Sequence, residues 1–272
     1  IEINEKDPEK FVEIVKALEP TFGGINLEDI KAPEAFEIER RLKEELDIPI
    51  MHDDQHGTAI ISSAALINAL EIAGKEISKV KIVVSGAGAA AISCMTLMIK
   101  LGALKENIFC FDSKGLLTES REDIDHRKRV FATTANFADL SEALVGADVF
   151  LGLSQGNIMN ADMVKSMSWN PIVFALANPN PEIDYNTAIA ARADIIMATG
   201  RSDHANQVNN VLAFPGIFRG ALDTGSTIEE KHKLAAAEAI DSLVKSPTAD
   251  HIIPSPLEPN VAKVVAAVFK NK

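Results

Sequence analysis

Residues 83–91 read Val-Val-Ser-Gly-Ala-Gly-Ala-Ala-Ala, a glycine-rich turn that joins an apolar strand pattern to an apolar helix pattern. Gly86 permits a tight turn, Gly88 lets a pyrophosphate approach the backbone, and the small Ala91 allows the helix to pack closely on the strand. The N-terminus of the helix offers free N–H groups and the positive end of its dipole to phosphate. The segment predicts a dinucleotide-binding turn; the alternative is a close-packed turn that binds no ligand.

An acidic residue follows the next strand, as this fingerprint requires. The strand is expected over residues 108–111, and Asp112 comes directly after it. A carboxylate at this place, about 20 residues after the glycine turn, binds the adenosine ribose 2′-hydroxyl and favours NAD. Ser113 and Lys114 come next, and the basic residues 127–129 could reach a 2′-phosphate. The sequence therefore leaves NAD and NADP both open.

Apolar strand patterns and helical patterns alternate along the rest of the chain. Strands are expected over residues 24–27, 48–51, 80–85, 108–111, 149–153, 172–176 and 195–198. Helices are expected over residues 8–18, 33–46, 58–73, 140–145, 161–167, 187–192, 228–244 and 260–269, and one more follows the glycine turn and ends near residue 102. This alternation is typical of an α/β fold with a mainly parallel, Rossmann-like sheet.

The chain has 272 residues and an acidic composition. Lys and Arg together number 27 and Asp and Glu number 39, which gives a net charge of −12. An acidic protein without a long basic run is not expected to bind nucleic acid or an anionic membrane surface. A hydrophobic content of 47% and a charged content of 24% exclude a disordered chain and a small disulfide scaffold.

The cysteines and the hydropathy pattern bear on the compartment. Cys94 and Cys110 fall in apolar segments and are expected to be buried free thiols, which suit a reducing compartment. The sequence has no uninterrupted apolar run of 18 residues, so we expect no membrane span. Residues 1–10 are charged and lack the apolar core of a signal peptide. We therefore expect a cytoplasmic protein.

Two acidic pairs lie just outside the nucleotide unit. Glu28 and Asp29 follow the first short strand, and Asp53 and Asp54 lie in an expected turn between the second strand and a buried helix. Carboxylates at strand ends beside a cofactor crevice are suited to Mg²⁺ or Mn²⁺. Surface carboxylates and helix caps are the alternative interpretation.

Histidines and asparagines supply the remaining polar candidates. His52 and His56 flank the second acidic pair; zinc is conceivable, but hard carboxylate ligands dominate, so we expect these histidines to orient the turn. Asn178, Asn209 and Asn210 lie where loops meet helices. Their amides could bind a carboxylate substrate or the nicotinamide carboxamide, or they could serve as turn and cap residues.

Together these motifs resemble the malic enzyme family. The resemblance is carried, in order along the chain, by residues 23–29, 52–59, 86–90, 112–116, 174–179 and 209–216. It extends from about residue 9 to residue 256, and the segment His-Asp-Asp-Gln-His-Gly-Thr is similar to the shorter bacterial-type enzymes. The resemblance implies oxidative decarboxylation of (S)-malate to pyruvate and CO₂, with NAD or NADP and with Mg²⁺ or Mn²⁺.

The functional residues of the family match positions of this chain. The metal ligands would be Glu28, Asp29 and Asp54. Asp53 matches the acid that pairs with the general-base lysine of the family. The dinucleotide site would comprise Gly86, Ala87, Gly88, Ala89, Ala90, Asp112, Ser113, Asn178 and Asn209. The substrate would contact Asn178 and Asn210.

The resemblance also implies a domain organisation and an assembly. Residues 54–209 would form a doubly wound, Rossmann-like NAD(P)-binding domain. Residues 1–53, which carry metal ligands, and the helical residues 210–272 would form part of a second α/β domain. The family suggests a homodimer or a higher homo-oligomer that acts on malate and releases pyruvate.

The family uses a tyrosine general acid and a lysine general base from an N-terminal region. This chain begins downstream of both, and its one tyrosine, Tyr185, does not match the catalytic motif. We therefore expect weak or absent turnover from the chain alone. A truncated NAD(P)-binding module, another NAD(P)-dependent dehydrogenase such as an amino-acid dehydrogenase, and a malate-to-lactate enzyme are the alternatives.

Overall fold

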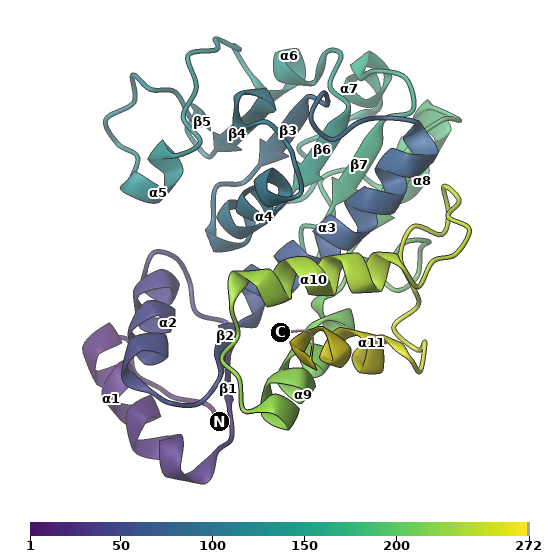
Figure 1. Ribbon diagram of the computed structural model, residues 1–272. Helices are drawn as coiled ribbons and strands as arrows, with labels where there is room; N and C mark the ends of the chain where they lie inside the picture. Colours follow the sequence, from purple (N-terminus) through teal and green to yellow (C-terminus); the bar gives the residue numbers. More distant parts are fainter. Residues whose placement is uncertain (271–272) are drawn as a thin grey trace.

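A six-stranded sheet forms the centre of the computed structural model, which describes residues 1–270 (Figure 1). Its strands are β3 (Ile82–Ser85), β4 (Ile108–Asp112), β5 (Gly115–Leu116), β6 (Val149–Gly152), β7 (Ile172–Ala175) and β8 (Ile196–Thr199). The spatial order is β5-β4-β3-β6-β7-β8, and every pairing is parallel except that of the short β5 with β4. The strand order reverses between β3 and β6, as in a Rossmann fold.

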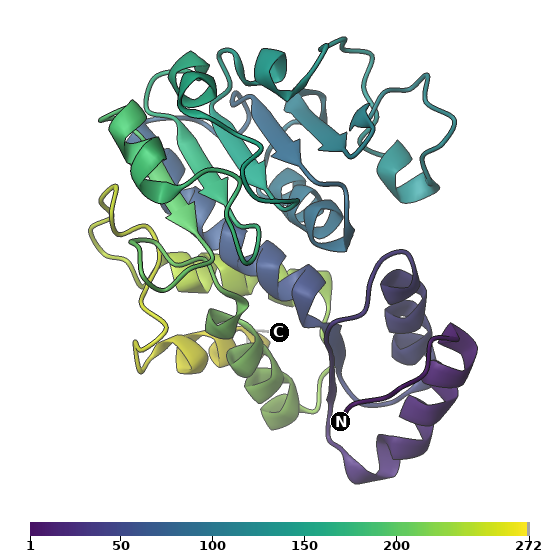
Figure 2. The same cartoon turned by 180° about the vertical axis from the view of Figure 1, so that it is seen from behind.

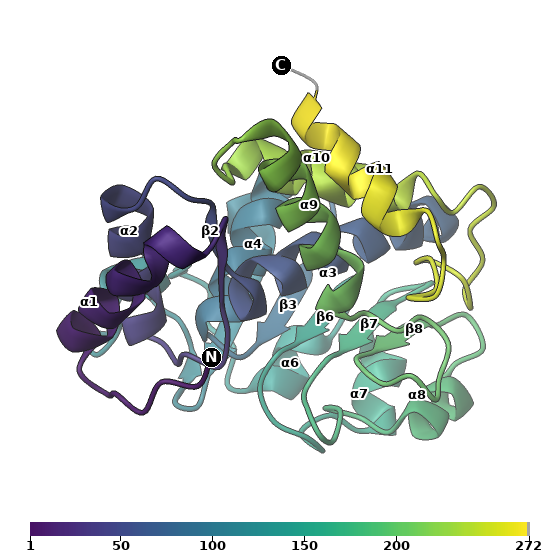
Figure 3. The ribbon, with the colours of Figure 1, turned by 90° about the horizontal axis from the view of Figure 1, so that it is seen from below.

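Helices cover both faces of this sheet. One face is covered by α3 (Asp53–Ala73) and α4 (Ala89–Lys100), and the other by α6 (Leu140–Leu144), α7 (Ala161–Ser166) and α8 (Tyr185–Ala191), as Figure 3 shows. Successive strand residues point to opposite faces, so Val84 and Phe174 lie in one hydrophobic cluster while Val83 and Phe150 lie in the other. The predicted doubly wound α/β fold is confirmed. Cys94 and Cys110 are buried and free, as predicted.

The N-terminal residues form a small unit at one side of the molecule (Figures 1 and 2). It contains α1 (Pro8–Leu18), β1 (Ile25–Leu27), α2 (Glu34–Glu45) and β2 (Ile50–His52), and β1 pairs with β2 in parallel. A separate hydrophobic cluster holds the unit together, with Val12 and Leu42 fully buried in it. The domain limits that we expect after residues 53 and 209 remain a prediction.

The C-terminal helices lie on the side of α3 away from the sheet. They are α9 (Phe214–Thr224), α10 (Glu230–Asp241) and α11 (Val261–Ala267). Of these, α10 packs against α3 and the other two pack on each other. Within residues 1–270, α3 is the one helix long and apolar enough to cross a membrane, but 72% of that stretch is buried inside the protein. This burial is what a core helix requires.

The first turn of α3 is the main difference from the sequence-based expectation. We expected Asp53 and Asp54 in a turn ahead of a helix beginning at Thr58, but α3 begins at Asp53. Gly57 does not interrupt the helix, and acidic residues at a helix N-terminus are stabilised by the helix dipole. The short elements β5 and α5 (His126–Arg129) were not predicted, because two to four residues give no periodicity to recognise.

A buried ion pair ties the end of α3 to the sheet. Lys75, just after α3, lies 2.8 Å from Asp148 and donates a second hydrogen bond of 2.8 Å to the Ser168 hydroxyl. The Lys75 side chain is 5% exposed. Removing one partner of such a pair leaves the other as an uncompensated, largely buried charge.

We therefore expect Lys75→Met to lower the free energy of unfolding by about 3 kcal/mol. The matched control is Lys79→Met, which breaks an exposed ion pair with Glu76 and should change stability by less than about 0.5 kcal/mol. Urea denaturation of both variants checks this expectation. Equal effects of the two substitutions would contradict the structural role given to Lys75.

Candidate active site

The glycine turn lies at the carboxyl ends of β3 and β6. Gly86 has φ +104°, its N–H donates to the Phe111 carbonyl at 2.8 Å, and a Cβ there would collide with the Leu153 carbonyl oxygen. A Cβ at Gly88 would meet no atom within 4 Å. Gly86 is therefore required by the fold itself, whereas the space beside Gly88 is free for a ligand.

A cavity of about 770 Å³ opens beside this turn. Of the predicted nucleotide residues, Gly86, Ala87, Gly88, Asp112 and Ser113 line it, while Ala89 and Ala90 form the first turn of α4 and do not. The cavity lies where the strand order reverses, which is where open α/β sheets bind dinucleotides.

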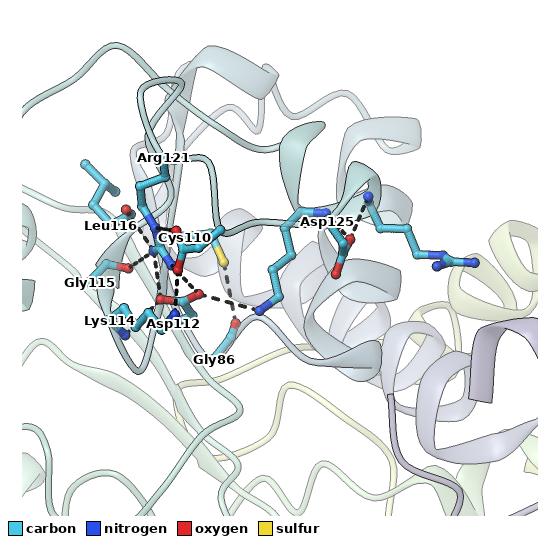
Figure 4. A network of polar contacts seen from close by, with 11 residues as sticks. Gly86, Cys110, Asp112, Lys114, Gly115, Leu116, Arg121 and Asp125 are labelled. Carbon is cyan, nitrogen blue, oxygen red and sulfur yellow. Dashed lines mark hydrogen bonds and ion pairs between the residues drawn. The ribbon is translucent and has the colours of Figure 1, made fainter. Parts of the chain in front are cut away.

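Asp112 is held by a network of cations (Figure 4). Its two carboxylate oxygens accept hydrogen bonds from Arg121 at 2.8 and 2.9 Å, and Lys128 Nζ lies 3.5 Å away. Burial raises the pKa of Asp112, but the hydrogen bonds from Arg121 and from the Lys114 N–H, together with the charges of Arg121 and Lys128, hold that pKa below its ordinary value. The carboxylate is thus ionised and largely neutralised by Arg121. This arrangement can accept a ribose hydroxyl and tolerates a nearby phosphate.

A second cavity of about 230 Å³ gathers the other predicted residues. It is lined by Glu28, Asp54, Asn178, Asn209 and Asn210, with Thr58, Ile61, Leu153, Leu176, Gly200 and Val208. These five polar residues come from the end of β1, the first turn of α3, the loop after β7 and the segment before α9. The loop after β6 separates the two cavities, because Leu153 lines this one and Ser154 lines the nucleotide cavity.

The carboxylates beside this second cavity are crowded. Asp53 is 1% exposed; its Oδ2 accepts a hydrogen bond of 2.5 Å from the Asn210 amide, and among the described residues its Oδ1 has no hydrogen-bond partner. Burial, together with the charges of Glu28 and Asp54, raises the pKa of Asp53 to about 7. Burial and Asp54 also raise the pKa of Glu28. Mutual repulsion of this kind favours the binding of a cation.

The donor set suits a hard divalent cation. Glu28 and Asp54 both face the cavity, and Asp54 also accepts the backbone N–H of Asp29 at 2.8 Å. Within residues 1–270, no group of three His, Cys, Asp or Glu side chains is close enough to hold a metal ion by itself. The carboxylates therefore fit Mg²⁺ or Mn²⁺ if further oxygen ligands come from substrate or water. The ligand role of Glu28, Asp29 and Asp54 stays a prediction.

The two histidines hold the first turn of α3 in place through hydrogen bonds. His52 Nε2 lies 3.1 Å from the Ile30 carbonyl, and His56 Nε2 lies 2.9 Å from the Glu39 carboxylate. These contacts agree with the prediction that the histidines orient the first turn of α3.

One buried acid was missed by the sequence analysis. Glu182 is fully buried and accepts the N–H groups of Ser154 at 3.0 Å and Ala177 at 3.1 Å, so it joins the loops after β6 and β7. Burial raises its pKa. A Cβ at Gly152 would lie 2.5 Å from a Glu182 carboxylate oxygen, so glycine is needed there. A loop carboxylate is expected to be exposed, and no local sequence pattern indicates that Glu182 is buried.

The chain is similar to malic enzymes along nearly its whole length. The family model described as "Malic enzyme, NAD binding domain" matches residues 55–270, and "Malic enzyme, N-terminal domain" matches residues 2–43. An NADP-dependent malic enzyme of Haemophilus influenzae is 51% identical over 99% of this chain, and the chain spans 38% of that relative's length. A bifunctional malic/malolactic enzyme of Bacillus subtilis is 50% identical, over 98% of this chain and 66% of its own length.

A solved structure supports the same relationship. The crystal structure of an NAD-dependent malic enzyme from Thermotoga maritima superposes with a TM-score of 0.93 at 45% identity. It covers all of this chain, and the chain covers 72% of that protein. The NAD-dependent and the NADP-dependent relatives are both similar to this chain, so the coenzyme preference stays open.

The two glycines of the turn should respond differently to alanine. Gly88→Ala should leave stability unchanged and weaken NADH binding about 10- to 100-fold, because its Cβ would occupy the space beside the turn and a lost charge-assisted hydrogen bond to phosphate costs about 1.5–3 kcal/mol. Gly86→Ala should lower the free energy of unfolding by about 2 kcal/mol, because of its positive φ. Fluorescence titration with NADH and thermal unfolding measure the two effects. A Gly88 variant that binds NADH normally would contradict the placement of the pyrophosphate.

Arg121 should influence coenzyme choice by neutralising Asp112. In Arg121→Met the carboxylate would repel a 2′-phosphate, so NADPH affinity should fall about tenfold or more relative to NADH affinity. Parallel titrations with the two coenzymes give this ratio. The control is Arg201→Met, which breaks an exposed pair with Asp203. An unchanged ratio in the Arg121 variant would mean that Asp112 does not face the ribose.

Proposed function

This chain belongs to the malic enzyme family, and from that premise we propose that it carries out oxidative decarboxylation of (S)-malate. The products are pyruvate and CO₂, and NAD⁺ or NADP⁺ is reduced. The observation that supports this proposal best is the placement of the acid- and asparagine-lined cavity next to the nucleotide cavity, across the loop at Leu153 and Ser154. Substrate and nicotinamide would meet at that loop.

The residues of the smaller cavity have chemistry that suits malate. The amides of Asn178 and Asn210 can donate hydrogen bonds to a carboxylate and orient it. The Asn210 amide also binds Asp53, so it links the substrate position to the buried acid. Glu28, Asp29 and Asp54 would hold Mg²⁺ or Mn²⁺, which supplies charge stabilisation at the C2 oxygen of malate. Holding the reactants in one orientation is itself a large contribution to rate.

Proton transfer would depend on a general base and a general acid that lie outside residues 1–270. Asp53 keeps one buried oxygen without a partner in residues 1–270, and a cation placed there would lower the cost of its charge. We propose that the general-base lysine of the family binds Asp53, and that this lysine and the tyrosine acid come from a region that is not in this chain. The chain alone would then have weak or absent turnover. A cytoplasmic location and a homo-oligomeric state are part of the same proposal.

A second candidate activity is the conversion of malate to lactate. The observation that favours it is the bifunctional malic/malolactic relative at 50% identity. In that reaction the NADH formed from malate would stay bound and reduce pyruvate, so no coenzyme is consumed. Lactate formation from malate with trace NAD⁺ distinguishes it from the first candidate, which needs one coenzyme per malate.

The test of the proposed function is malate-dependent NAD(P)H formation with and without Mn²⁺. It should be run on this 272-residue chain and on a form extended at the N-terminus. Failure of the extended form to show Mn²⁺-dependent turnover would refute the proposed function. Full activity of the shorter chain would refute the account of the acid and base.

Asp54→Ala in the extended form should lower kcat/KM about 100-fold or more, because a metal ion stabilises developing charge by several kcal/mol. Steady-state rates over a range of Mn²⁺ concentrations measure this loss. The control is Asp162→Ala, whose exposed side chain makes an ion pair with Lys165 on α7. An active Asp54 variant would favour a dehydrogenase that uses no metal.

A further inference from the structure

A buried polar network contacts the first turn of α3 on the side away from the acidic cavity. At its centre is Glu39 of α2, a carboxylate that is 6% exposed. It accepts hydrogen bonds from Lys43 at 2.6 Å, from the His52 backbone N–H at 3.2 Å and from His56 Nε2 at 2.9 Å. Burial raises the pKa of Glu39, but His56 and Lys43 hold it well below its ordinary value. Glu39 is therefore an ionised anchor for this turn.

Lys233 of α10 forms a hydrogen bond with the other ring nitrogen of His56. Its Nζ lies 2.9 Å from His56 Nδ1 and also donates to Glu230 at 2.5 Å, and the residue is 3% exposed. An ammonium group has no acceptor, so His56 Nδ1 must accept this hydrogen bond. The ring proton then sits on Nε2 and is donated to Glu39.

The bridge joins parts of the molecule that have separate hydrophobic cores. Glu39 belongs to the N-terminal unit, whereas His56 and Lys233 lie on α3 and α10 of the main body. The predicted metal ligands are divided in the same way, because Glu28 lies in the N-terminal unit and Asp54 on α3. The distance from Glu28 to Asp54 therefore depends on how the unit is set against α3, which the hydrogen bond from the Asp29 N–H to Asp54 fixes beside the cavity and the bridge fixes on the other side. Apolar contacts allow sliding, whereas hydrogen bonds with fixed donors and acceptors do not.

We propose that Glu39, His56 and Lys233 act as a positioning clamp that aligns Glu28 with Asp54 and so sets the strength of divalent-metal binding. The proposal rests on the proposed function, since it assumes that these acids bind Mg²⁺ or Mn²⁺. None of the three clamp residues lines the acidic cavity. They act through the position of the first turn of α3, as partners that orient ligands do in other metal sites.

The test is calorimetric titration of the natural full-length protein with MnCl₂ in the absence of malate. His56→Leu removes both hydrogen bonds, and we expect Mn²⁺ affinity to fall about tenfold or more. Lys233→Met keeps the apolar stem of the lysine and should lower Mn²⁺ affinity by the same amount. It provides a second variant in case His56→Leu does not fold. His56→Gln supplies an amide N–H donor for Glu39 and a carbonyl acceptor for Lys233, so Mn²⁺ binding should be retained. NADH affinity should not change in any of them.

Lys75→Met is the matched control, because it breaks a buried ion pair at the opposite end of α3. It should lower stability but leave Mn²⁺ affinity unchanged. Normal Mn²⁺ affinity in His56→Leu and Lys233→Met, or an equal loss in Lys75→Met, would overturn the clamp. Failure of the unmodified protein to bind Mn²⁺ or to oxidise malate would instead refute the proposed function.

Discussion

The crowding of carboxylates at the N-terminus of α3 is the constraint on which the rest of the site depends. Burial raises the pKa of Glu28 and of Asp53, and the negative charge of Asp54 beside them raises both further. The helix dipole, the Asp29 N–H and the Asn210 amide reduce this cost. A divalent cation would relieve it further. An acidic cluster that only served stability would gain nothing from such repulsion.

The nucleotide half of the site depends on close backbone approach. Gly86 lies against the Leu153 carbonyl, and Gly152 lies against the buried Glu182 carboxylate, so the loops after β3, β6 and β7 fit together without side chains between them. Glu182 fixes two of these loops through their N–H groups. Because Asn178 lies on one of them, the same buried acid also positions a residue that lines the acidic cavity.

The sequence predicted most of the fold because its signals are local. The apolar strands β3, β4, β6, β7 and β8 and the glycine turn were recognisable from periodicity and residue type. The predicted start of α3 at Thr58 was wrong, because Gly57 and the polar residues before it look like a turn. Tertiary contacts extend the helix back to Asp53. The bridge from His56 to Lys233 joins residues 177 positions apart, and no local pattern predicts it.

The most direct test of the account is an anomalous-scattering map of the full-length protein crystallised with Mn²⁺ and malate. We expect one strong manganese peak between the carboxylates of Glu28 and Asp54, with malate beside Asn178 and Asn210. A manganese peak elsewhere, or malate bound away from the nucleotide cavity, would contradict the central claim that this acidic cluster is the catalytic centre.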